Sequence, residues 1–125
     1  MNGIHLLGEW FECGDGPAFT LLQPLRSLCL ELTSACGLTV VGDAFHQFHP
    51  HGVTGTVLLA ESHLAIHTWP ESRFASVDVF VCNYRSDNTA KAMLLFDRLR
   101  EALRPARVHE QMIHRGEGDR VLRAA

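Results

Sequence analysis

One stretch of the chain decides the fold class: Arg73-Phe74-Ala75-Ser76-Val77-Asp78-Val79-Phe80-Val81-Cys82. Successive side chains of a β-strand point to opposite faces, so this stretch has two faces of different character. One face is apolar and carries Ala75, Val77, Val79 and Val81. The other carries Ser76, Asp78, Phe80 and Cys82. The first face suits a core covered by helices. The second favours a half-polar interface that contains a site, with an ordinary solvated sheet face as the alternative.

Strands and helices are predicted on both sides of this stretch. Further strands are expected at 4–12, 38–46, 53–60, 63–69 and 106–114, and a Gly-rich polar tail follows the last one. Apolar residues at helical spacing run from Leu21 to Ala35, and Gly37 suits the end of that helix. Pro24 is tolerated only in a first turn, so the helix should start near Thr20. A second helix is expected to begin after Asp87 as its N-cap and to end before Pro105.

The element order β-α-β-β-β-β-α-β predicts the architecture. Strands joined by short turns should pair antiparallel, and two amphipathic helices need one sheet face to cover. We therefore expect an α+β fold, a two-layer sandwich with an antiparallel sheet and two helices on one face. The other sheet face would need a partner or solvent.

Length and composition limit the class of protein. A chain of 125 residues suits a single domain over 1–125, which buries roughly 65–70% of its unfolded surface and needs no disulfide or metal to fold. The net charge of −3 gives no sign of the positively charged surface that nucleic-acid binding requires. No apolar run approaches the ~18 residues of a membrane span. Residues Met1 to His5 show neither the basic region nor the apolar region of a signal peptide, so a cytoplasmic protein is expected. The cysteines form no C-x-x-C pair and are expected as free thiols: Cys13, Cys29, Cys36 and Cys82.

The segment from Leu59 to Glu71 concentrates chemically active side chains. It holds a serine, two histidines and two carboxylates in otherwise strand-like sequence. Three interpretations compete on the residues alone. A metal site is suggested by five histidines between 46 and 67, but no familiar ligand spacing is present. A serine hydrolase is disfavoured, because the chain lacks the G-x-S-x-G motif that places the nucleophile in such enzymes. The third interpretation, strand residues without a special role, is favoured by composition alone.

Longer motifs change this balance. The chain resembles the prokaryotic S-adenosylmethionine decarboxylase proenzymes, a pyruvoyl-dependent family, over most of its length. The likeness covers His5 to Cys13, Phe45 to Gly55, Glu61 to Glu71, Asp78 to Cys82, and Arg107 to His109. The run E-S-H-L-x-I-H-T-W-P-E is highly specific. The resemblance implies a small α/β sandwich that works as a homodimer of processed subunits.

The resemblance also implies that the chain cleaves itself. Ser62 would attack the carbonyl of Glu61, and elimination would leave a pyruvoyl group at Ser62 and the products 1–61 (beta chain) and 62–125 (alpha chain). His67 matches the proton acceptor in processing, and a neutral imidazole suits that task near pH 7. Thr54 matches a hydroxyl residue that supports processing. The implied cofactor is this pyruvoyl group, with no metal.

The implied reaction is decarboxylation of S-adenosylmethionine. The substrate amine would form a Schiff base with the pyruvoyl group, and the products would be CO₂ and decarboxylated S-adenosylmethionine, the aminopropyl donor of spermidine biosynthesis. Cys82 matches the proton donor, because a thiol is mostly protonated at neutral pH. Phe48 matches an aromatic residue that stacks on the adenine, and Glu71 matches a carboxylate that recognises the substrate.

The spacing of Ser62 and His67 adds a geometrical expectation. Five residues apart on a regular strand, they face opposite sides and lie roughly 16 Å apart. A two-fold partner removes this difficulty. We expect each site to combine Ser62 and Cys82 of one subunit with His67 and Thr54 of the other.

Two departures from the family pattern leave alternatives open. Thr54 stands where the family usually has serine, which could slow processing, and Asn83 stands where it usually has glycine, which could narrow the site. A pyruvoyl-dependent arginine or ornithine decarboxylase of the same fold is one alternative. A homologue that is never cleaved and acts only as a dimer partner is another.

Overall fold

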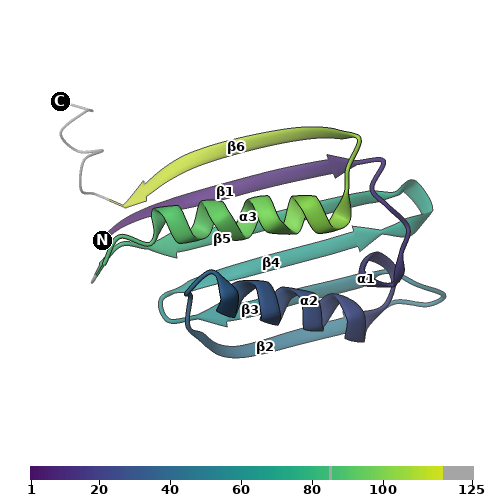
Figure 1. The fold of residues 1–125 in the computed structure, drawn as a ribbon, viewed down its shortest axis with the longest axis horizontal. Helices are drawn as coiled ribbons and strands as arrows, with labels where there is room; N and C mark the ends of the chain where they lie inside the picture. Colours follow the sequence, from purple (N-terminus) through teal and green to yellow (C-terminus); the bar gives the residue numbers. More distant parts are fainter. Residues whose placement is uncertain (85, 117–125) are drawn as a thin grey trace.

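The computed structural model describes residues 1–84 and 86–116, and the Gly-rich tail expected after the last strand lies outside them. The chain forms one six-stranded sheet in the order β2-β3-β4-β5-β1-β6 (Figure 1). The strands are β1 (Asn2–Phe11), β2 (Val40–Gln47), β3 (Val53–Leu59), β4 (Ser62–Trp69), β5 (Phe74–Cys82) and β6 (Arg107–Gly116). The helical elements are α1 (Pro17–Thr20), α2 (Leu22–Ala35), the 3-10 turn η1 (Pro70–Ser72) and α3 (Thr89–Leu103).

The predicted architecture is confirmed. Every neighbouring pair of strands is antiparallel. Helices α2 and α3 lie side by side on one face of the sheet, as Figure 1 shows. The fold is therefore an α+β sandwich of two layers, and no helix among residues 1–84 and 86–116 covers the second face of the sheet.

The structure departs from the expectation at two helix starts. Pro17 begins a separate single turn, α1, and extended backbone at Leu21 separates it from α2, which starts two residues after the expected Thr20. The N-cap of α3 is Asn88 rather than Asp87. The Asp87 carboxylate instead accepts the Thr89 N–H at 3.0 Å, and this bond lowers the pKa of Asp87.

The core lies between the helices and the apolar face of the sheet. The four apolar residues predicted for β5 are fully buried: Ala75, Val77, Val79 and Val81. The apolar stripe of α3 is buried against them and consists of Ala92, Leu95, Phe96, Leu99 and Leu103. Burying a leucine or phenylalanine side chain stabilises a fold by about 1.5–3 kcal/mol, so this layer supplies the main driving force for folding.

The opposite face of the sheet is half-buried and mixed. Its β5 residues Ser76, Asp78 and Phe80 are neither fully covered nor fully exposed. The ring of His5 meets those of Phe80 at 5.7 Å and His63 at 6.1 Å. Its Nε2 atom is buried but finds no hydrogen-bond partner in the described chain, because the Asp78 carboxylate is 3.8 Å away. We call this surface the open face.

Candidate active site

The turn between β3 and β4 places a strained residue next to the candidate nucleophile. Glu61 has a φ of 63°, in the left-handed region that residues other than glycine rarely adopt. Such a conformation costs on the order of 1–3 kcal/mol. Ser62 follows as the first residue of β4. The local strain therefore sits at the residue whose carbonyl Ser62 is predicted to attack.

Ser62 and Cys82 meet at one end of the sheet. The Cys82 N–H donates to Ser62 Oγ at 3.0 Å, from the last residue of β5 to the first of β4. Both residues line a cavity of about 280 Å³ together with Glu61, Asn88 and Lys91. The fold thus brings together three predicted residues: the two that flank the cleavage site and the proton donor.

His67 and Thr54 form a second pair, away from the first. They face each other across β3 and β4, and Thr54 Oγ1 lies 3.0 Å from His67 Nδ1. Both line another cavity, which Ser62 does not reach. Because β4 runs without a break from Ser62 to Trp69, Ser62 and His67 of one chain are held roughly 16 Å apart. His67 is therefore not beside its own Ser62.

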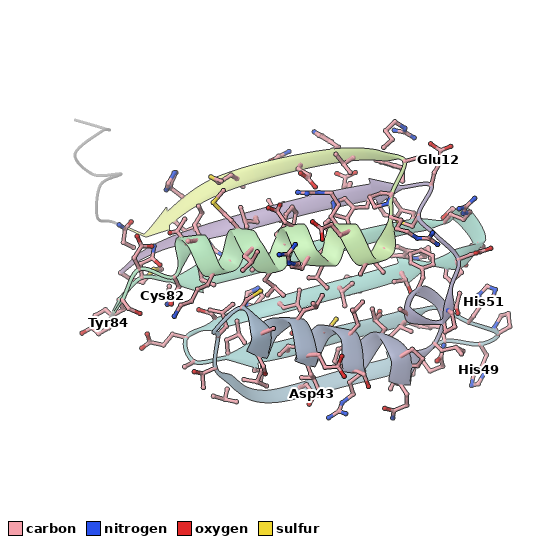
Figure 2. All side chains as sticks on the ribbon, in the orientation of Figure 1. Glu12, Asp43, His49, His51, Cys82 and Tyr84 are labelled. Carbon is pink, nitrogen blue, oxygen red and sulfur yellow. The ribbon has the colours of Figure 1, made fainter. Side chains whose placement is uncertain are left out.

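Phe48 and Glu71 belong to the same end of the sheet as His67. They line a cavity of about 440 Å³ with Trp69 and Thr54. The Phe48 side chain is 48% exposed. His49 and His51 of this cavity lie at one end of the molecule and Cys82 at the other (Figure 2). The predicted recognition residues are thus distant from the predicted cleavage site.

A residue missed by sequence reasoning shapes the Phe48 loop. The Gln47 side-chain amide donates to the carbonyls of Thr20, Phe48 and Gly52 at 2.9–3.1 Å. Its oxygen accepts the Leu22 N–H at 2.7 Å. No local sequence signal points to this role, because two of its partners lie more than 20 residues away.

Comparisons with known proteins place this arrangement in a family. The family model described as S-adenosylmethionine decarboxylase matches residues 4–116. The chain belongs to the S-adenosylmethionine decarboxylase family. A relative named S-adenosylmethionine decarboxylase proenzyme from Thermotoga maritima is 37% identical over 119 residues, which cover 95% of this chain and 88% of the relative.

Two further relatives agree. A proenzyme of the same name from Pseudomonas aeruginosa is 42% identical over 97 residues, covering 78% of this chain and 60% of that one. The crystal structure of the adenosylmethionine decarboxylase from Aquifex aeolicus superimposes with a TM-score of 0.83 at 34% identity, covering 91% of this chain and 90% of that one. The recognised family and the expected fold are therefore both confirmed.

The remaining cysteines of this family member have a structural role. Cys13, Cys29 and Cys36 are buried free thiols. Burial raises the pKa of Cys13 to about 11 and that of Cys29 to about 12, and it also raises the pKa of Cys36. These thiols stay protonated and packed at neutral pH.

Asn83, which departs from the family pattern, does not narrow the cavity at Ser62. Its side chain points to the start of α3, where Nδ2 donates to Thr89 Oγ1 at 3.0 Å and Oδ1 accepts the Asn88 N–H at 2.8 Å. It is absent from the residues that line the cavity. In the single chain, local polar partners therefore hold the amide away from this cavity.

Two further findings concern residues 1–84 and 86–116. No three side chains of His, Cys, Asp or Glu come together there as a metal site. None of the helices there has the length and apolar character required to span a membrane.

Proposed function

We propose that this chain is a proenzyme that cleaves itself between Glu61 and Ser62 and then decarboxylates S-adenosylmethionine. One observation carries the proposal: the strained Glu61 precedes a serine whose hydroxyl is held by the Cys82 N–H at a cavity. The names of the relatives, decarboxylase proenzymes, agree with both parts of it.

The cleavage needs only groups of the chain and water. Ser62 Oγ bonds to the carbonyl carbon of Glu61, the C–N bond breaks, and the amine takes the hydroxyl proton, which leaves an ester. A base removes the Ser62 α-proton, the Cβ–Oγ bond breaks, and residues 1–61 depart with a carboxylate at Glu61. The dehydroalanine left at residue 62 adds water and loses ammonia. The second product, 62–125, then begins with a pyruvoyl group.

His67 is the proposed base for the α-proton. If its Nδ1–H donates to Thr54 Oγ1, Nε2 is free to accept a proton, and a neutral imidazole suits that task. Its distance from Ser62 in the same chain requires His67 of a second copy. The proposed assembly is a homodimer across the open face, with each site built from two subunits. The mixed character of this face and the unpartnered Nε2 of His5 support a covering partner.

The residues around Ser62 fit the pyruvoyl group that the family name implies. Ser62 begins a strand at a cavity, so an N-terminal group generated there has room for a substrate. When present, the group supplies a carbonyl that binds the substrate amine and accepts the electrons released with CO₂. Cys82, beside Ser62, donates the proton to the substrate α-carbon.

The other end of the sheet supplies recognition. The exposed ring of Phe48 is available to stack on the adenine, and the exposed carboxylate of Glu71 accepts hydrogen bonds from the substrate. In the dimer these side chains come from the partner, as His67 does. The product would serve as the aminopropyl donor for spermidine biosynthesis in the cytoplasm.

Intact-mass measurement of the purified protein tests the cleavage directly. Wild type should give two fragments that divide between Glu61 and Ser62. Ser62→Ala should stay whole while it remains folded, because the change removes one hydroxyl. Ser72→Ala, at an exposed serine of η1, is the matched control and should cleave normally.

Release of CO₂ tests the substrate. The processed protein should release CO₂ from S-adenosylmethionine and not from arginine or ornithine, and the reverse result would select the other pyruvoyl decarboxylases. Wild-type protein that stays whole would instead identify a homologue without activity, acting only as a dimer partner.

A further inference from the structure

Asn88, at the end of the loop between β5 and α3, forms a hydrogen bond with the backbone of Cys82, the proposed proton donor. Asn88 Nδ2 donates to the carbonyl of Cys82 at 3.0 Å. The N–H of the same Cys82 donates to Ser62 Oγ at 3.0 Å. The backbone of Cys82 is thus bonded on one side to Asn88 and on the other to the nucleophile.

Asn83 keeps Asn88 in this place. Its Oδ1 accepts the Asn88 N–H at 2.8 Å, and its Nδ2 donates to Thr89 Oγ1 at 3.0 Å. Its own N–H donates to the carbonyl of Asn2 at 2.7 Å, which ties the loop to the start of β1. The two asparagines therefore connect Cys82 to the first turn of α3 and to a neighbouring strand.

We propose that Asn88, held by Asn83, is a positioning residue for self-cleavage. The attack on Glu61 requires Ser62 Oγ within about 3–3.5 Å of the carbonyl carbon and correctly oriented. The Cys82 N–H occupies one lone pair of that oxygen and so restricts where it can lie. Asn88 fixes the peptide that follows Cys82, and so it restrains, through the Cys82 α-carbon, the preceding peptide from which this N–H projects. The inference rests on the proposed function and extends it to residues outside the cleavage motif.

The structural neighbour Asp87 provides a matched control. Its carboxylate accepts the Thr89 N–H, so Asp87→Ala weakens the start of α3 without removing a bond to Cys82. Asn88→Ala deletes the donor to the Cys82 carbonyl. Asn88→Asp keeps the shape of the side chain but places an oxygen opposite that carbonyl.

The experiment follows cleavage of freshly made precursor by intact mass, with thermal unfolding measured on the same samples. Both Asn88 variants should cleave about ten- to a hundred-fold more slowly than wild type, because a small displacement of a reacting atom is costly. Asp87→Ala should lose comparable thermal stability and cleave at the wild-type rate.

Hydroxylamine at neutral pH identifies the step that is slowed, because it cuts esters there and leaves ordinary peptide bonds intact. Cleavage at Asn2–Gly3, which alkaline hydroxylamine attacks, would give a different mass. Precursor of the Asn88 variants should resist hydroxylamine, since the ester has not formed. Precursor of His67→Ala should be cut, since it lacks only the base for the later elimination. A role of Asn88 in stability alone would not produce this difference.

Three results would overturn the inference while wild type cleaves. The Asn88 variants cleave as fast as wild type, they slow only as much as Asp87→Ala, or their precursor is cut by hydroxylamine. Wild-type protein that never cleaves would overturn the proposed function and this inference with it.

Discussion

The two ends of β4 differ in what they offer to a reaction. The Ser62 end holds a strained turn and the Cys82 backbone in a cavity of about 280 Å³. The His67 end holds the hydroxyl of Thr54 and a larger cavity of about 440 Å³ with the exposed Phe48 ring. In the proposed mechanism, one end breaks a bond, and the other removes a proton and holds the substrate. A single strand keeps them apart, so one chain carries two incomplete half-sites.

The largest expected effect comes from mixing two variant proteins, each of which keeps only one of the two ends of β4 intact. Neither Ser62→Ala nor His67→Ala should cleave measurably alone. Ser62→Ala lacks the nucleophile, and His67→Ala lacks a base of the kind that contributes roughly 10²- to 10⁴-fold. When the two variants are mixed and allowed to exchange subunits, one of the two shared sites regains both Ser62 and His67. The His67→Ala chain in the mixture should then cleave, as intact mass would show.

The control for this mixture is a chain that carries both substitutions. Mixed with His67→Ala it should leave that chain uncleaved, because the mixture still contains Ser62 but neither chain supplies His67. If His67→Ala is not cleaved in the first mixture although subunits exchange, the two half-sites do not combine across subunits.

A smaller effect is expected from the recognition end alone. Phe48→Ala should raise KM for S-adenosylmethionine about five- to a hundred-fold, because stacking of a base on an aromatic ring contributes ~1–3 kcal/mol. Self-cleavage should be unchanged, since Phe48 takes no part in the proposed cleavage step and its exposed ring adds little to the core. Phe48→Tyr keeps the ring and serves as the control, and equal KM values for all three proteins would place the adenine elsewhere.

The hydroxyl at position 54 should have a still smaller effect on maturation. Thr54→Val removes the partner of His67 Nδ1 while keeping the shape of the side chain. One hydrogen bond contributes ~0.5–1.5 kcal/mol, so cleavage should slow about two- to ten-fold. Thr54→Ser keeps the hydroxyl and should mature at least as fast as wild type in the same time course. Equal cleavage rates for Thr54→Val and Thr54→Ser would show that the hydroxyl of residue 54 takes no part in self-cleavage.

The smallest effect concerns the open face between the two ends. Burial lowers the pKa of His5, Asp78 opposes this, and Arg115 and His63 add to it. Between the usual value of about 6.5 and the lower folded pKa, the unfolded chain binds more protons than the folded one. The free energy of unfolding therefore falls as the pH drops through this window and is unaffected above it.

His5→Phe should remove this part of the pH dependence. Between about pH 8 and about pH 5, the Tm of the wild type should fall further than that of the variant. Thermal unfolding at both pH values provides the measurement. An equal Tm loss in both proteins would show that His5 titrates normally.

Sequence patterns located most elements to within about two residues, because alternation and helical spacing are local properties. The separate turn α1 was missed, since the choice between one helix and two depends on the extended backbone at Leu21. Gln47 and Asn88 were missed for a different reason. Each acts through backbone groups that folding brings near, and neither carries a motif of its own.

The sequence by itself determined the two-layer sandwich, through the two faces of 73–82, and the family, through the motif around Ser62. Only the tertiary structure decided which residues meet. Ser62 lies against Cys82, and His67 against Thr54, because the antiparallel registers of β3, β4 and β5 bring segments 13 to 20 residues apart side by side. The extended backbone of β4 holds the two pairs at opposite ends, since each residue of a strand adds about 3.3 Å.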